Sequence, residues 1–259
     1  MGTPYRLRTN RMPNCRDALA STRRFGQSAR VARAGDEVEW PCLLGGSLRP
    51  LGCAVSFIDA PFTAVLAAVL DVHRGTRVDV SPSAPFPQCV WALDPMQAPW
   101  TKALVIDCDG WSAYLNNSIG GGDLTAIAPA IARRHGWQCI GAEHMPRYGP
   151  GHAATQLWIQ GTSGTPPLGD VRTLAAHAED GRWSWHESGS TQPFEQTERY
   201  TARRKRDRLD RPLLVEYLNA MGIRVDDERF FGSGVVVTQR VDLPSRTESV
   251  EQFRQKNGW

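Results

Sequence analysis

Lysine, paired cysteines and long apolar runs are all scarce in this sequence. Only Lys102, Lys205 and Lys256 are lysines among the 30 basic residues. Together with the frequent alanine and glycine, this preference for arginine indicates a GC-rich bacterial genome. It reflects codon usage and carries no information about chemistry.

The six cysteines are scattered, and no two of them form a C-x-x-C pair. In a chain of 259 residues this pattern is typical of reduced thiols in a cytosolic protein rather than of a disulfide framework. The same spacing argues against a structural zinc site. The six are Cys15, Cys42, Cys53, Cys89, Cys108 and Cys139.

The longest apolar stretch runs from Phe62 to Leu70. A transmembrane helix needs about 20 apolar residues, so this stretch is too short to span a bilayer. The basic N-terminus is not followed by the apolar segment of a secretory signal. We therefore expect a cytoplasmic protein that makes no membrane contact.

Motifs for nucleotides, cofactors and catalytic zinc are also missing from the sequence. The glycines at 120–122 lack the lysine of a phosphate-binding loop, so we interpret them as a flexible turn. No G-x-S-x-G nucleophile motif is present. We expect no cofactor and no metal, although four histidines fall between positions 144 and 186: His144, His152, His177 and His186.

Positive charge is concentrated in two segments, although the net charge of the whole chain is only +3. Residues 1–34 carry eight arginines and one acid, and residues 199–211 carry seven basic residues and two acids. Such segments suit an anionic ligand or an acidic protein surface. The modest net charge and the lack of a groove-reading element argue against nucleic acid. Ion pairs Arg203–Asp207 and Arg206–Asp210 would fit a salt-bridged helix face.

The composition, 41% apolar and 22% charged, is that of an ordinary globular protein. We expect a basic N-terminal arm at 1–34 and a single domain at 35–259. The stretch 81–99 contains five prolines and is the candidate joint between subdomains.

The clearest local signal is Asp109-Gly110, which predicts a tight hairpin turn between two alternating segments. A two-residue loop makes Cys108 oppose Trp111 and Asp107 oppose Ser112. Side chains of a strand alternate between its faces, so the hairpin has one apolar and one polar face. The polar face carries Val105, Asp107, Ser112, Tyr114 and Asn116.

A second hairpin is predicted at Asp180-Gly181. Its pairing makes His177 oppose Ser184, with His186 as the diagonal neighbour of His177. The polar face of this hairpin carries Thr173, His177, Ser184, His186 and Ser188.

Further strands and helices are predicted from periodicity and end signals. The strands are expected at 52–58, 76–80, 137–145, 154–161 and 234–241. The helices are expected at 62–74, 124–136 with Asp123 as cap, 196–209 and 212–222. This pattern predicts an α+β fold, in which helices pack on one face of a mostly antiparallel twisted sheet built around the two hairpins.

If both hairpins turn their apolar faces to one core, their polar faces combine into a candidate pocket. Asp107 would be the general base, with Ser112, His177 and His186 as further catalytic residues. The alternative interpretation is an ordinary wet sheet face, on which serine, glutamine and histidine are common. The expected substrate-binding residues are Tyr114, Asn116, Gln156, Trp158, Ser184 and Arg147.

Two functions follow from these alternatives. The pocket would serve a cofactor-independent, lyase- or transferase-like enzyme that performs elimination, transfer or cyclisation on a small polar or anionic metabolite, as in bacterial specialised metabolism. A solvent-exposed sheet face would instead suit a non-catalytic protein-binding module, such as an immunity or antitoxin-like protein. Its acidic partner would meet the basic arm and the basic helix.

Overall fold

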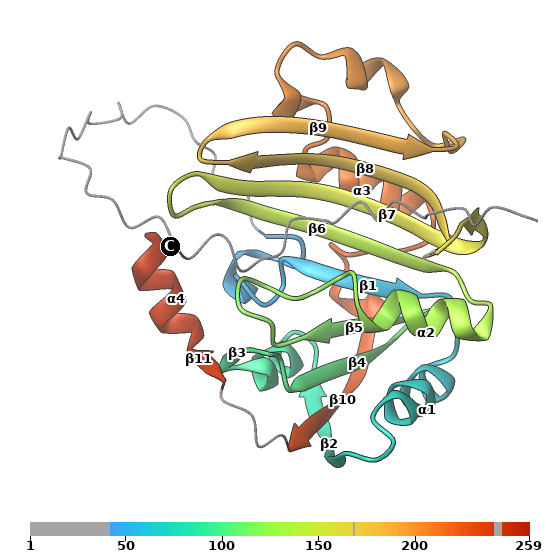
Figure 1. Ribbon diagram of the computed structural model, residues 1–259, viewed down its shortest axis with the longest axis vertical. Helices are drawn as coiled ribbons and strands as arrows, with labels where there is room; N and C mark the ends of the chain where they lie inside the picture. The colour runs from blue at the N-terminus through green and yellow to red at the C-terminus, as the bar shows by residue number, and fades with distance from the viewer. Residues whose placement is uncertain (1–41, 168, 241–244) are drawn as a thin grey trace, which may run out of the picture. The chain divides into compact units, whose positions relative to one another are not determined.

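The computed structural model describes residues 42–167, 169–240 and 245–259 (Figure 1). The arm expected at 1–34 lies outside the described residues, and its boundary with the following domain stays a prediction. No helix in these described ranges has the length and apolarity that crossing a membrane would take.

A nine-stranded antiparallel sheet organises the described chain, with the order β2-β10-β4-β5-β1-β6-β7-β8-β9 (Figure 1). A two-stranded sheet, β11-β3, accompanies it. The predicted α+β class and antiparallel sheet are therefore confirmed. The strands are β1 (Ala54–Ile58), β2 (Arg77–Pro85), β3 (Met96–Ala98), β4 (Lys102–Cys108), β5 (Trp111–Asn116), β6 (Cys139–Tyr148), β7 (His152–Thr165), β8 (Asp170–Glu179), β9 (Arg182–Gly189), β10 (Phe231–Arg240) and β11 (Arg246–Glu248).

Both Asp-Gly hairpins form in the predicted register. Asp107 opposes Ser112 across β4 and β5, and His177 opposes Ser184 across β8 and β9. In the second turn Asp180 and Gly181 have φ of 48° and 74°, the left-handed backbone that a twisted two-residue hairpin requires. Local turn chemistry was therefore sufficient to fix these registers.

The short strand β1 separates the two hairpins within the sheet. It pairs with β5 on one side and β6 on the other, although both partners follow it by more than 50 residues. All five of its residues are buried. It therefore links the hairpin β4-β5 to the consecutive strands β6 to β9.

Helices cover both faces of the sheet, rather than the single face we expected. Helices α1 (Phe62–Val72) and α2 (Ile127–His135) pack with a smaller apolar core around Tyr114. Helices α3 (Arg211–Ala220) and α4 (Val250–Asn257) contribute to the larger core on the opposite face. Leu157 and Ile159 of β7 lie in that larger core.

The expected helix at 196–209 is wrong. Only two short 3-10 helices form there, η4 (Thr197–Thr201) and η5 (Lys205–Asp207). The ion pairs differ accordingly, because Arg199 binds Asp210 and Arg206 binds its neighbour Asp207. Consecutive arginines have no apolar stripe to bury, so nothing favours a longer helix here.

Helix α2 begins later than expected. Asp123 accepts hydrogen bonds from the backbone and hydroxyl of Thr125 instead of capping the helix. The later start places Pro129 in the first turn, where proline is tolerated. Gly136 ends the helix in a left-handed conformation, as predicted.

The turn between β6 and β7 packs directly on the β8-β9 hairpin and depends on Gly151. Its φ is +115°, and an added Cβ would lie 2.7 Å from the backbone nitrogen of Gly181. Gly45 has a similar φ of +111° but open space around it. A substitution at Gly151 therefore causes both backbone strain and steric overlap, whereas a substitution at Gly45 causes backbone strain alone.

We expect Gly151→Ala to lower the free energy of unfolding by about 3 kcal/mol and Gly45→Ala by about 1 kcal/mol. Both substitutions strain a left-handed backbone, but only the first forces two turns apart. Urea denaturation of both variants measures the difference, and equal losses would contradict the close packing of these turns.

Candidate functional site

The polar faces of the two hairpins point to the same side of the sheet but lie far apart. Asp107 is on β4 and His177 is on β8, five strand positions away. With about 4.8 Å between strands, this separation alone is about 24 Å. The register also places Asp107 level with Gln160 on β7, whereas His177 pairs with Ala154 near the other end of that strand. The composite pocket that we expected from Asp107 and His177 is therefore not formed.

Around the first hairpin, the residues expected in the site do not line a cavity. Ser112 is fully buried and donates a 2.8 Å hydrogen bond to the Ala60 carbonyl. Tyr114 is buried among the side chains of α1 and α2, and burial raises the pKa of its hydroxyl. Asp107 is exposed near the turn. These positions give Asp107 neither the burial nor the neighbours that a general base requires.

Asn116 orders the glycine-rich turn that follows β5. Its amide nitrogen donates to the Asp123 carbonyl at 3.0 Å, and its oxygen accepts from the backbone nitrogens of Ser118 and Asp123 at 3.1 Å. The side chain therefore uses its hydrogen bonds within the protein. It holds the turn at 118–123, and a ligand would have to displace these bonds.

The second hairpin and its neighbours do bring several expected residues together. Gln156 and Trp158 on β7, His177 on β8, and Ser184 and His186 on β9 all lie on the sheet face opposite the larger core. Gln156, Trp158 and His177 are partly buried, whereas Ser184 and His186 on the outer strand β9 are exposed. Arg147 is exposed as well, and its carbonyl accepts a hydrogen bond from the Trp259 indole.

A hollow of about 320 Å³ lies on this part of the sheet. Its lining combines alanines with imidazole, amide, hydroxyl and carboxyl groups, a combination that a small polar ligand could use. Of the residues expected from sequence, only Gln156 and His177 line it. The lining residues are Tyr148, His152, Ala153, Ala154, Gln156, His177, Ala178 and Glu179.

Beside the hollow stands Glu143, a residue that our sequence interpretation did not place in the site. It lies on β6 opposite Gln156, whose amide donates a 2.8 Å hydrogen bond to its carboxylate. Burial raises the pKa of Glu143 to about 7, although the bond from Gln156 opposes this rise. A carboxyl group that titrates near neutrality can accept or give a proton under physiological conditions. The alternation of β6 could have shown that Glu143 shares a face with Gly141, but not which strand lies beside it.

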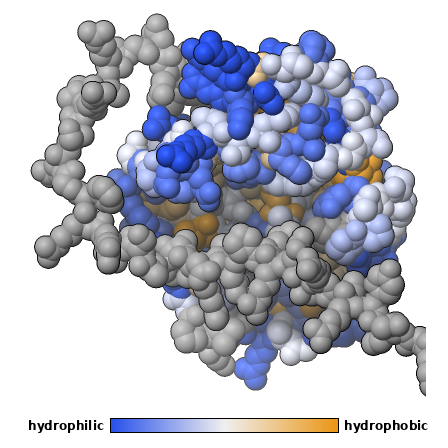
Figure 2. All heavy atoms as spheres, turned by 45° about the horizontal axis from the view of Figure 1, so that its top comes forward, coloured by the Kyte–Doolittle hydropathy of each residue, from blue (hydrophilic) through white to orange (hydrophobic). Residues whose placement is uncertain are grey.

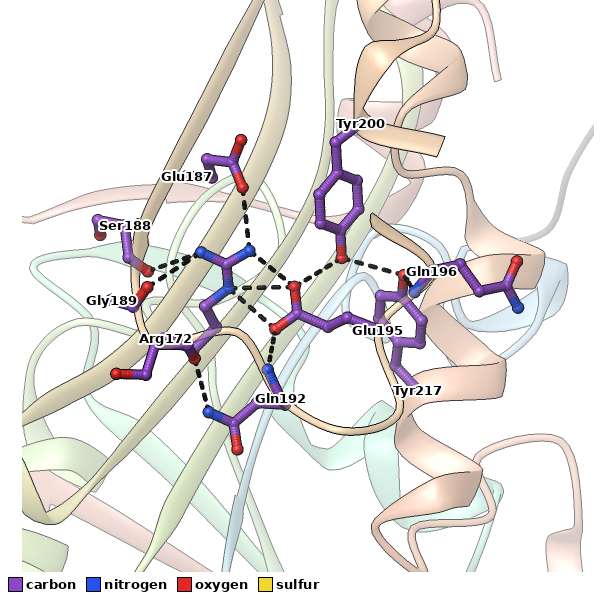
Figure 3. Close-up of polar contacts among 10 residues, drawn as sticks. Arg172, Glu187, Ser188, Gly189, Gln192, Glu195, Gln196, Tyr200 and Tyr217 are labelled. Atoms are coloured by element: carbon purple, nitrogen blue, oxygen red, sulfur yellow. Dashed lines mark hydrogen bonds and ion pairs between the residues drawn. The ribbon is translucent and has the colours of Figure 1, made fainter. Parts of the chain in front are cut away.

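On the opposite face of the sheet, a buried ion pair attaches the segment after β9 (Figure 3). The Arg172 guanidinium, 4% exposed, forms an ion pair with the fully buried Glu195 carboxylate at 2.7 Å. Glu195 also accepts from the Tyr200 hydroxyl and the Gln192 backbone nitrogen, and Tyr200 contacts the Tyr217 hydroxyl of α3. All charges in this cluster are compensated internally, so we interpret it as a structural anchor.

Strongly hydrophilic residues gather on the visible surface near β9 and the segment that follows, as Figure 2 shows. Segment 203–206 contributes four consecutive cations there, all exposed. Nearby, Arg208 lies over the Trp185 ring, with 6.0 Å from its guanidinium carbon to the ring centroid.

Across the described residues, no group of three or more His, Cys, Asp or Glu side chains is arranged to hold a metal ion. Comparison with protein-family models, with curated proteins and with solved structures gives no match. The function of the protein is therefore inferred from the geometry of the site.

The raised pKa of Glu143 predicts a pH-dependent stability. Because the folded pKa of about 7 exceeds the ordinary value of 4.5, the folded state binds a proton more tightly than the unfolded chain does. Stability is then lost as pH rises from about 4.5 to about 7, by on the order of 1–3 kcal/mol. We expect Glu143→Gln to remove this loss, so that the variant exceeds the original protein in stability at pH 8 but not at pH 4.5.

Urea denaturation at the two pH values measures this effect. Glu228→Gln changes an exposed glutamate of the 3-10 helix η6 (Glu228–Phe230) and is the matched control. The assignment fails if Glu143→Gln and the control show the same pH profile.

Removing one partner of the buried ion pair should destabilise the protein strongly. Glu195→Gln removes the buried carboxylate and leaves Arg172 only the partly exposed Glu187 as a charged partner. We expect a loss of about 3–5 kcal/mol in the free energy of unfolding. Glu187 also binds Arg172, at 3.0 Å, but its side chain is 42% exposed. Glu187→Gln should therefore cost less than about 1 kcal/mol. Equal losses in denaturation experiments would show that burial does not set the strength of these pairs.

Proposed function

We propose that the hollow on β6 to β8 binds a small polar ligand and that Glu143 exchanges a proton with it. The protein would then be a cofactor-independent acid–base enzyme of the lyase or transferase type. The observation that carries this proposal is the Glu143 carboxyl, with its pKa raised to about 7, beside a hollow lined by imidazole and amide groups. A bacterial source and a cytoplasmic location belong to the same proposal.

The register supports a division of roles among three residues. Gln156 opposes Glu143 directly and fixes the orientation of its carboxylate through their hydrogen bond. His177 is the diagonal neighbour of Gln156 on β8, because Gln156 pairs with Ala175. Such diagonal neighbours lie about 7–8 Å apart, so one small ligand could contact both. In this proposal Glu143 acts as the base, Gln156 orients it, and His177 binds the ligand or returns the proton.

Binding is the first test of this proposal. A panel of small carboxylates, phosphate esters and amines is screened by saturation-transfer NMR against the full chain at pH 7. We expect at least one compound to bind, and His177→Ala to weaken its binding by about tenfold or more. Glu228→Gln should leave binding unchanged. If no compound binds, or if every hit binds His177→Ala equally well, the hollow is not the ligand site.

Proton transfer is tested separately on the compounds that bind. Conversion of each compound, or deuterium uptake from heavy water, is followed by NMR. Loss of a general base typically costs 10²–10⁴ in rate, so we expect a fall of about this size in Glu143→Gln. Ligand binding by this variant should be largely retained. Unchanged turnover in Glu143→Gln would exclude Glu143 as the base.

The second candidate function is a non-catalytic protein-binding module, as in an immunity or antitoxin-like protein. It is favoured by the exposure of Ser184 and His186 on β9 and of the cations at 203–206. An acidic protein partner would complement these charges. This function would be supported over the first if no small compound binds and if the protein forms a complex with an acidic protein that dissociates at high salt concentration.

A further inference from the structure

Cys42 and Cys53 lie at the two ends of an irregular segment that folds back on itself before β1. The Leu44 backbone nitrogen donates to the Gly52 carbonyl at 3.0 Å, and the Gly52 nitrogen donates to the Leu48 carbonyl at 2.7 Å. A Cβ built on Gly52 would lie 3.5 Å from the Cys42 sulfur. The Cys42 thiol donates a 2.8 Å hydrogen bond to the Gly45 carbonyl. It sits against the backbone next to Cys53, whose thiol is placed to donate a hydrogen bond to the Cys42 sulfur.

The surroundings of the two thiols differ in a way that suits two different chemical roles. The hydrogen bond with Cys53 and the positive charges of Arg49 and Arg211 lower the pKa of Cys42. Burial raises the pKa of Cys53 well above its ordinary value. Arg211 is fixed close by, because its guanidinium donates to the carbonyls of Cys42 and Leu43 at 3.2 and 2.9 Å.

The three other described cysteines provide a comparison within the same chain. Burial raises the pKa of Cys89 to about 11 and the pKa values of Cys108 and Cys139 to about 12. Each is buried, and none has an arginine acting on its thiol. Cys42 is equally buried, so it is the lowered pKa of its thiol and the nearby arginines that distinguish it from these three.

We propose that Cys42 and Cys53 form a redox-active dithiol, which a small hydroperoxide converts to a disulfide. The Cys42 thiolate attacks one oxygen of the peroxide, and the O–O bond breaks. When the hydroperoxide is hydrogen peroxide, the other oxygen takes up a proton and leaves as water. Cys42 is then a sulfenic acid. The Cys53 sulfur attacks the Cys42 sulfur, the S–O bond breaks, and a second water leaves as the S–S bond forms. The two thiols lose two electrons together, and hydrogen peroxide is reduced to two waters.

Access to the thiols requires a local opening, because both cysteines are fully buried. The segment 42–53 contains no regular secondary structure beyond the three-residue 3-10 helix η2 (Gly46–Leu48). Its tip at Gly46 and Ser47 is exposed, but Leu43, Leu48 and Leu51 are buried in the larger core. Oxidation under native conditions therefore needs a local opening that displaces these side chains, and it should be slower than oxidation of an exposed thiol.

The disulfide would secure the segment to the sheet next to the proposed site. Cys53 directly precedes β1, and its carbonyl accepts a 2.8 Å hydrogen bond from the backbone nitrogen of His144. His144 follows Glu143 on β6. A bond between Cys42 and Cys53 would thus restrict the backbone that carries Glu143. The dithiol itself does not depend on the function proposed for that residue.

The test uses the reduced full chain, hydrogen peroxide at pH 7, and mass spectrometry after thiol alkylation. Before alkylation we expect the intact mass to fall by about 2 Da, and after alkylation we expect Cys42 and Cys53 alone to remain unmodified until a dithiol reductant is added. Urea denaturation should show that the oxidised chain unfolds at a higher urea concentration than the reduced chain.

Single substitutions assign the roles within the pair. Cys42→Ser should abolish the crosslink, and Cys53→Ser should leave a sulfenic acid on Cys42 that dimedone traps. Cys139→Ser is the matched control and should form the crosslink at the original rate. If a serine variant fails to fold, peptide mapping of the original chain still decides. Free Cys42 and Cys53 after peroxide treatment, or a crosslink between any other cysteines, would overturn the proposal.

Discussion

The pairing of β1 with two partners distant in sequence is the constraint on which the rest of the sheet depends. Its five buried residues join β5 to β6 and so combine a four-stranded group with the consecutive strands β6 to β9. Both hairpins are local structures that could form early, whereas this pairing requires closure of a long loop. The position of β1 also decides which polar residues become neighbours. It separates Asp107 from His177, whereas Glu143 and Gln156 meet because the consecutive strands β6 and β7 pair.

Much of the local structure could be predicted, because turn chemistry and alternation are encoded in short segments. The Asp-Gly dipeptides gave the registers of both hairpins, and alternation gave their apolar faces. The order of strands could not be predicted, because nothing in β1 specifies its partners beyond being apolar. The expected site failed for this reason. Ser112 and Tyr114 do lie on the predicted face, but helices α1 and α2 cover it there.

Charged residues were the second source of error. Arg172 occupies an inward position of β8, where alternation alone predicts an apolar residue, and its charge is compensated by Glu195 from a segment 23 residues later. Sequence reasoning assigns such an arginine to solvent, because a buried charge is tolerated only with a partner that the sequence does not reveal. The helix expected at 196–209 had a different basis, the spacing of Arg203–Asp207 and Arg206–Asp210. That segment instead contains Tyr200, whose hydroxyl donates to Glu195 and holds the start of the segment against the sheet.

The sequence of the outer strand β2 affects whether copies of the protein can associate through the edges of their sheets. Its free edge lies at the end of the sheet, and the strand carries Pro82 and Pro85, which lack the backbone N–H that a further strand would need. Arg77 and Asp79 add charge along the same strand. Growth into fibrils by pairing of β2 edges is therefore disfavoured, because the prolines and charges hinder the addition of another strand.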